Sequence, residues 1–324
     1  MITRQLHGSG DEREEPAAMI LLYTVALAMS AGMSMATCAT VFKWADVMRD
    51  AGHGTMFMAF VCMCLWSISS LMRIIAVYLN DRDDTLANRT ILNLSIPTEV
   101  FYNAASFWFA LIAYEIQRRA LRPRTASSNR TAMIWYTAVI FGAAAVLLAS
   151  LFVLDCFNVI VDDDDEGIVE QKRLVRYILE HVSWVTQGIR SAAVLYAGGM
   201  ALWLYRKRGL VAFEKLPRAL LGIVTLFFLL NVPDLIVDPL CDFKVIDTDV
   251  YPFMPSVVKF IKFSVGGAIS LLMGGSVAGF DVFFHVARPR SRLSPATSGN
   301  SIAAAPQNLD FFVISDASPT TVMR

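Results

Sequence analysis

Charged residues are scarce in this sequence: Asp, Glu, Lys and Arg make up 17% of its 324 residues. A soluble domain carries about 25% charged and about 45–50% apolar residues, whereas 56% of this chain is apolar. Its 28 basic and 28 acidic residues cancel, so it has no overall positive field of the kind that attracts nucleic acid. These proportions exclude an ordinary soluble globule and indicate a membrane protein without a nucleic-acid partner.

Cysteine and histidine are also sparse. Five cysteines in a chain of this length exclude a disulfide-dense secreted scaffold. The histidines fall in separate regions of the sequence, which argues against a metal cluster: they are His7, His53, His181 and His285. The sequence also lacks a phosphate-binding glycine loop, an H-E-x-x-H motif and a G-x-S-x-G motif. We therefore expect no metal, no cofactor and no enzymatic activity.

What the sequence does contain is long apolar runs. A membrane-spanning helix needs about 20 mostly apolar residues. Seven segments qualify, and they run over Ala17–Phe42, Thr55–Tyr78, Ile96–Ile116, Thr131–Leu154, His181–Tyr205, Leu216–Val237 and Pro252–Phe280. The expected fold class is an all-α bundle of seven transmembrane helices. The fifth and seventh runs are the least convincing by hydropathy, because they contain Arg190, Lys259 and Lys262.

The expected bundle, residues 17–284, lies between an acidic N-terminal segment (1–16) and a C-terminal tail (285–324). The tail is rich in Ser, Pro, Ala and Thr, which predicts disorder. Lys and Arg accumulate in cytoplasmic loops, and here one side of the bundle carries 16 of them and the other side 8. This asymmetry predicts an N-terminus outside or in the lumen and a C-terminus in the cytosol. The acidic run at 162–166 falls on the outer side.

The loops on both sides of the bundle offer candidate sites. On the cytosolic side, basic residues could hold partner proteins or anionic lipid: they are Arg118, Arg119, Arg122, Arg124, Arg206, Lys207 and Arg208. On the outer side, Asn88 heads an N-x-T glycosylation motif. Cys156 and Cys241 also fall there, either as a disulfide or as two free thiols at span ends.

Ionisable and amide side chains inside membrane spans are costly and are functional candidates by default. They are Glu99, Asn103, Asn231, Asp234, Lys259 and Lys262. We expect Asp234 to pair with one of the two lysines, because the sixth span returns close to the seventh. Three interpretations stay open: charge pairs that hold helices in register, a small-ligand or ion site open to the outer side, and a retinal Schiff base on Lys262.

Several local features occur in a characteristic order. Trp44 follows the first run, Arg73 ends the second, and Pro97 opens the third, which continues to Ala113-Tyr114-Glu115-Ile116. Leu195-Tyr196-Ala197-Gly198-Gly199 lies in the fifth run. In these features, over residues 43–205, the sequence resembles the tobamovirus multiplication protein family of plant seven-span membrane proteins, which has animal orphan-receptor-like relatives.

The resemblance implies a vacuolar, endolysosomal or plasma-membrane protein without enzymatic activity, which binds cytosolic proteins such as small-GTPase signalling components. We therefore expect a receptor-like scaffold in the lipid bilayer that recruits cytosolic partners through its basic loops. The alternatives are a ligand receptor coupled to G proteins, and a proton or ion transporter that uses Lys262. The sequence leaves open whether a second copy of the chain is a partner. We expect Gly198-Gly199 and Gly266-Gly267 to allow close helix approach.

Overall fold

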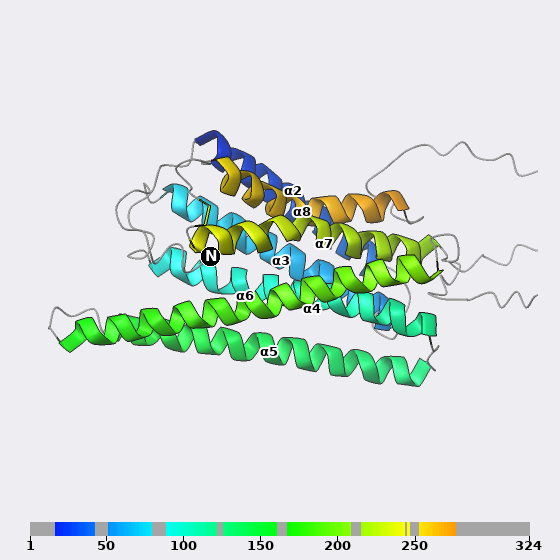
Figure 1. Ribbon diagram of the computed structural model, residues 1–324, viewed down its shortest axis with the longest axis horizontal. Helices are drawn as coiled ribbons and strands as arrows, with labels where there is room; N and C mark the ends of the chain where they lie inside the picture. Colours follow the sequence, from blue (N-terminus) through cyan, green and yellow to red (C-terminus); the bar gives the residue numbers. More distant parts are fainter. Residues whose placement is uncertain are drawn as a thin grey trace, which may run out of the picture.

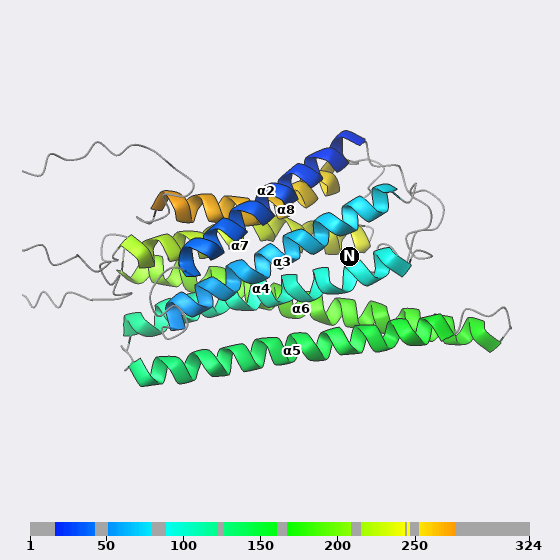
Figure 2. The ribbon, with the colours of Figure 1, turned by 180° about the vertical axis from the view of Figure 1, so that it is seen from behind.

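The computed structural model describes residues 17–42, 51–79, 89–121, 126–160, 167–208, 215–243, 245–246 and 253–276. This part of the chain forms a bundle of seven helices: α2 (Ala17–Phe42), α3 (Ala51–Leu79), α4 (Arg89–Leu121), α5 (Ala126–Ile160), α6 (Gly167–Arg208), α7 (Lys215–Asp242) and α8 (Phe253–Ser276). Figures 1 and 2 show that the helices lie roughly along one axis and that consecutive helices run in opposite directions. The start of α2 and the end of α8 therefore lie at opposite ends of the bundle.

The all-α prediction is confirmed, because each apolar run falls within a different helix. Only the ends of the last run, Pro252 and 277–280, lie outside the described residues of α8. Five of the described helices, α2, α3, α5, α7 and α8, are long and apolar enough to cross a membrane. The chain is therefore a multi-pass membrane protein.

The two helices that fall short of this test are α4 and α6. The low hydropathy expected for the run with Arg190 is confirmed in α6. The last run also has low hydropathy, the lowest of the five candidate spans, but α8 still passes the test, whereas α4, which was not expected to be weak, does not. The reason is that apolar and small residues surround Lys259 and Lys262, whereas α4 carries Glu99, Asn103 and a polar C-terminal end.

The centre of the bundle is built around α4, which contacts α3, α5, α6 and α7. The rings of Trp66 on α3 and Tyr102 on α4 stack with their centroids 4.8 Å apart. About two turns further along, Phe109 on α4 stacks on Phe227 of α7 at 4.0 Å. These aromatic contacts join α3, α4 and α7 into one buried core.

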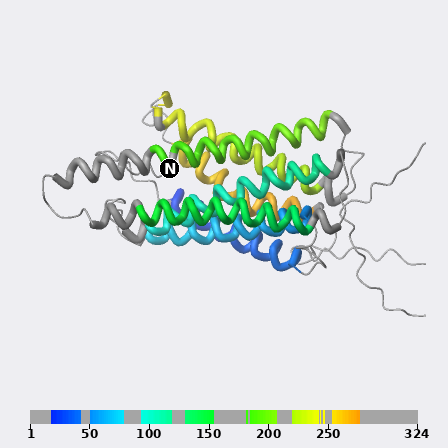
Figure 3. Tube along the Cα trace, turned by 90° about the horizontal axis from the view of Figure 1, so that it is seen from below, coloured from blue at the N-terminus to red at the C-terminus, as the bar shows by residue number. Residues whose placement is uncertain are grey.

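The outer helices turn apolar side chains away from the core. On α5, which runs along one edge of the bundle in Figure 1 and lies at the front of the view in Figure 3, the exposed side chains include Ile134, Trp135, Val139 and Val146. Large exposed apolar surfaces on a protein indicate contact with a membrane or a partner. In a helix of this length and hydropathy the natural contact is the lipid bilayer.

A close approach of α2 and α8 confirms one of the predicted glycine pairs. The hydroxyl of Ser30 on α2 donates a hydrogen bond to the carbonyl of Phe263 on α8 (2.6 Å) and accepts one from the Gly267 amide (3.1 Å). A Cβ added at Gly266 would lie 3.1 Å from the Cβ of Ser30. In the other pair, a Cβ at Gly198 would meet the ring of Phe228, whereas Gly199 faces open space.

Candidate functional site

An ion pair joins α7 and α8 in the interior. Lys262 Nζ donates a hydrogen bond to Asp234 Oδ2 at 2.6 Å, and their side chains are only 3% and 7% exposed. The predicted pairing of Asp234 with one of the two lysines is confirmed, and the partner is Lys262. Lys259 lies one turn earlier on α8 and is partly buried. The helix that carries Asp234 runs without a break through Pro233 and Pro239.

A second ion pair joins α4 and α6, the two helices with the most polar spans. Arg190 Nη1 lies 2.9 Å from Glu99 Oε1. The amide nitrogen of Asn103 donates hydrogen bonds to the same carboxylate oxygen (3.0 Å) and to the backbone carbonyl of Glu99 (2.9 Å). The charges that lower the hydropathy of these helices are therefore neutralised against each other, which reduces the cost of burying them.

Tyr102 links the two ion pairs. Its ring centroid lies 4.9 Å from Arg190 Cζ and 4.7 Å from Lys262 Nζ, both within cation–π range. Its hydroxyl donates a hydrogen bond to Asn231 Oδ1, and the Asn231 amide donates to the carbonyl of Phe227 at 2.7 Å. We call this set the Tyr102 network: Glu99, Tyr102, Asn103, Arg190, Asn231, Asp234 and Lys262.

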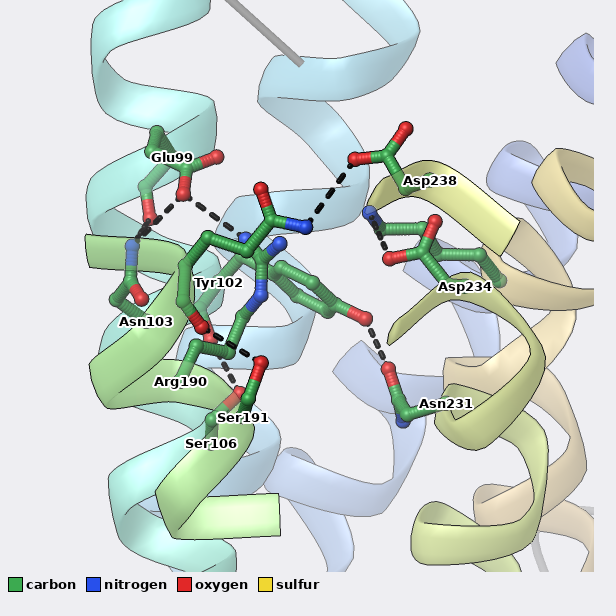
Figure 4. A network of polar contacts seen from close by, with 11 residues as sticks. Glu99, Tyr102, Asn103, Ser106, Arg190, Ser191, Asn231, Asp234 and Asp238 are labelled. Atoms are coloured by element: carbon green, nitrogen blue, oxygen red, sulfur yellow. Dashed lines mark hydrogen bonds and ion pairs between the residues drawn. The ribbon is translucent and has the colours of Figure 1, made fainter. Parts of the chain in front are cut away.

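Figure 4 shows how the network spans the bundle: Glu99 and Asn103 project from one side, Asn231 and Asp234 from the other, and Tyr102 reaches between them. At its edge, Gln187 of α6 donates a hydrogen bond to Asp238 of α7 at 3.4 Å. The network thus connects α4, α6, α7 and α8 through charges and hydrogen bonds. A substitution that removes one of these polar side chains leaves a charge or a hydrogen-bonding group elsewhere in the core without its partner.

A small cavity adjoins the network. Its volume is about 40 Å³, and its lining includes Glu99, Tyr102 and Lys262 of the network together with Trp66 and Arg73 of α3. One water molecule needs about 10–15 Å³ measured in this way, so the cavity has room for roughly three. Sites for organic ligands are about 300–1,000 Å³. This cavity therefore suits water or a small ion.

The sequence analysis identified most of the network but missed Tyr102 and did not include Arg190 among the site residues. Arg190 could have been predicted from the sequence, because a lone arginine inside an apolar run needs an acidic partner on another helix. Glu99, in the third run, is such a residue. The sequence signal for Tyr102 is weaker: it follows Glu99 by three residues and therefore lies on the same face of the helix. The two cation–π contacts of its ring depend on the packing of α6 and α8, so nothing in the sequence predicts them.

The basic candidates are only partly covered by the structure. Arg118 lies 3.7 Å from Glu115, whose carboxylate accepts a hydrogen bond from the Tyr136 hydroxyl at 2.5 Å. Arg206 is exposed near the end of α6. The remaining candidates lie outside the described residues or have side chains that do: Arg119, Arg122, Arg124, Lys207 and Arg208.

The outer-loop candidates stay predictions. Asn88 lies outside the described residues, and so do the N-terminal segment 1–16 and the tail from residue 277 onward. The disulfide between Cys156 and Cys241 is also untested, because the side chain of Cys156 is outside the described part. Among the described side chains, no three His, Cys, Asp or Glu residues are grouped as a metal ion would require.

Comparison with known proteins identifies no relative of this chain. No protein-family model matches it, and no curated protein matches it significantly. The resemblance to the tobamovirus multiplication protein family therefore stays a prediction. Function has to be argued from the chemistry of the bundle itself.

Proposed function

We propose that this multi-pass membrane protein is a non-enzymatic, receptor-like scaffold that crosses the bilayer seven times. Its N-terminus lies outside or in the lumen, and its basic cytosolic segments recruit partner proteins such as small GTPases or G proteins. The observation that carries the proposal is that four of the interior charges compensate one another in two pairs. Glu99 pairs with Arg190, and Asp234 pairs with Lys262.

Paired interior charges favour a structural role for the Tyr102 network. Each ion pair ties together two different helices, and the adjoining cavity of about 40 Å³ is far smaller than an organic ligand. An attached retinal would need a polyene-sized space beside Lys262. A bundle held closed in this way leaves its cytosolic end as the surface on which partners act. The paired charges also support membrane crossing by α4 and α6, whose spans are the most polar.

The test uses the two ends of α6, each of which carries three cations. One variant replaces the cytosolic cluster with glutamine (Arg206→Gln, Lys207→Gln, Arg208→Gln), and the matched control replaces the outer cluster (Lys172→Gln, Arg173→Gln, Arg176→Gln). Proximity labelling from an enzyme fused after Arg324 records the cytosolic neighbours in living cells. We expect the first variant to lose a set of cytosolic proteins that the control retains. Retention of every neighbour by both variants would refute the scaffold proposal.

A second candidate is proton or ion transport, because Glu99 and Lys262 both line the cavity. In proteoliposomes, a transporter would show flux that depends on pH and is lost in Lys262→Met. A scaffold would show no flux in the unmodified protein. A G-protein-coupled ligand receptor is the third class, and it would require the two ion pairs to separate before an organic ligand could enter.

A further inference from the structure

The cavity beside the Tyr102 network has an unbalanced lining. Arg73 of α3, Glu99 of α4 and Lys262 of α8 all line it, so two cations face one carboxylate. Glu99 Oε1 already accepts hydrogen bonds from Arg190 and Asn103, and Lys262 already donates one to Asp234. Asp238 does not line the cavity. The lining therefore carries net positive charge.

Arg73 is the source of the imbalance. Within the described ranges, no ion pair of 4.0 Å or less joins its guanidinium to a carboxylate, although it lies within the candidate membrane span Ala51–Tyr78 of α3. A guanidinium keeps its charge under physiological conditions, and an uncompensated charge inside a membrane span is costly. A counter-ion in the cavity would offset this cost.

A second observation, independent of charge, points to the same place. Ser70 lies one turn before Arg73, lines the cavity and is only 3% exposed. Its hydroxyl oxygen makes no hydrogen bond in the described part of the protein. A buried polar group without a partner costs about 1–3 kcal/mol. The Ser70 hydroxyl is therefore a hydrogen-bond donor that faces the cavity and lacks an acceptor.

We propose that this cavity binds a small monovalent anion, with chloride as the representative species. Arg73 supplies the charge, Ser70 a neutral hydrogen bond, and the Lys262 ammonium further positive potential. The cavity volume of about 40 Å³ accommodates a halide but excludes larger organic anions. A monovalent anion also matches the single excess positive charge. This site goes beyond the proposed scaffold function and does not depend on it.

The test is an anion titration of the full chain in detergent or nanodiscs, with sodium gluconate replaced by sodium chloride at constant ionic strength. Thermal unfolding is followed at each step. We expect a saturable rise of Tm by about 4 °C when chloride is about tenfold above half-saturation. Arg73→Gln should abolish the rise, whereas Arg206→Gln, which removes an exposed arginine from the opposite end of the bundle, should retain it.

Ser70→Ala keeps the proposal testable if Arg73→Gln fails to fold. It removes one hydrogen bond, so the chloride concentration for half-saturation should rise about tenfold, which corresponds to one hydrogen bond of about 1.4 kcal/mol. Its matched control is Ser69→Ala, because the Ser69 hydroxyl donates to the Trp66 carbonyl at 3.0 Å and does not line the cavity. No chloride-dependent rise in the unmodified protein, or an equal rise in Arg73→Gln, would overturn the anion site. An unchanged half-saturation in a folded Ser70→Ala protein would overturn the role of Ser70.

Discussion

The ring of Tyr102 contacts two cations from different helices: Arg190 Cζ of α6 lies 4.9 Å and Lys262 Nζ of α8 4.7 Å from its centroid. Each cation also has its own carboxylate, Glu99 for Arg190 and Asp234 for Lys262. The ring therefore connects two ion pairs that would otherwise be independent. This coupling makes the centre of the bundle a single unit, and the effects of substitutions there should depend on one another.

Removing one member of the Lys262–Asp234 pair should destabilise the protein strongly. Asp234→Asn leaves the Lys262 ammonium buried without its counter-charge, and breaking a buried pair in this way costs about 3–5 kcal/mol. The double variant Asp234→Leu with Lys262→Met removes both charges and should cost less than Asp234→Asn alone. Thermal unfolding in nanodiscs measures both. If the double variant were the less stable of the two, the pair would contribute through more than mutual charge compensation.

Tyr102 should contribute through both its hydroxyl and its ring. Tyr102→Phe removes the hydrogen bond to Asn231 and keeps the cation–π contacts, so we expect a loss of about 1–3 kcal/mol. Tyr102→Leu also removes the contacts with Arg190, Lys262 and the stacked Trp66, so the loss should be larger. Thermal unfolding of both variants separates the two contributions. Equal stability of the Phe and Leu variants would show that the ring contacts contribute nothing measurable.

The α2–α8 contact should tolerate no side chain at Gly266. Gly266→Val places atoms against Ser30 and Ser34, whose nearest atoms already lie 3.1 Å from an added Cβ, and overpacking of this kind costs about 1–3 kcal/mol. The matched control is Gly199→Val, because a Cβ at Gly199 meets nothing within 4 Å. We expect a lower Tm and yield for the first variant only. Comparable losses in both would point to a requirement for backbone flexibility.

Glycosylation offers a direct check on the predicted orientation. The motif at Asn88 is expected on the outer side, and the motif at Asn129 is expected on the cytosolic side, where glycosylation does not occur. In a eukaryotic host, Asn88→Gln should abolish or reduce the mass shift that a glycosidase removes, whereas Asn129→Gln should leave it unchanged. Loss of the glycan in Asn129→Gln alone would reverse the orientation.

The helices of this protein were predictable because the bilayer imposes a length and a composition on every span. The run Thr131–Leu154 contains no charged residue, and it lies within α5. The pairing of Asp234 with a lysine was also predictable, since Pro233–Asp234 and Lys259–Lys262 lie on consecutive helices. The sequence could not predict that the partner is Lys262 and not Lys259, because this depends on the rotation of α8 about its own axis.

The sequence by itself therefore determined that this is an all-α, multi-pass membrane protein with costly charges in its spans. Its apolar runs are longer than a soluble core needs, and their positions do not depend on how the helices pack. Tertiary structure alone decided that Glu99 meets Arg190 across 91 positions of sequence and that Tyr102 lies beside both ion pairs. It also decided that Arg73 and Ser70 face one cavity with Lys262. The physical reason is that these contacts join residues on different helices, whose relative positions follow from the packing of all the described helices at once.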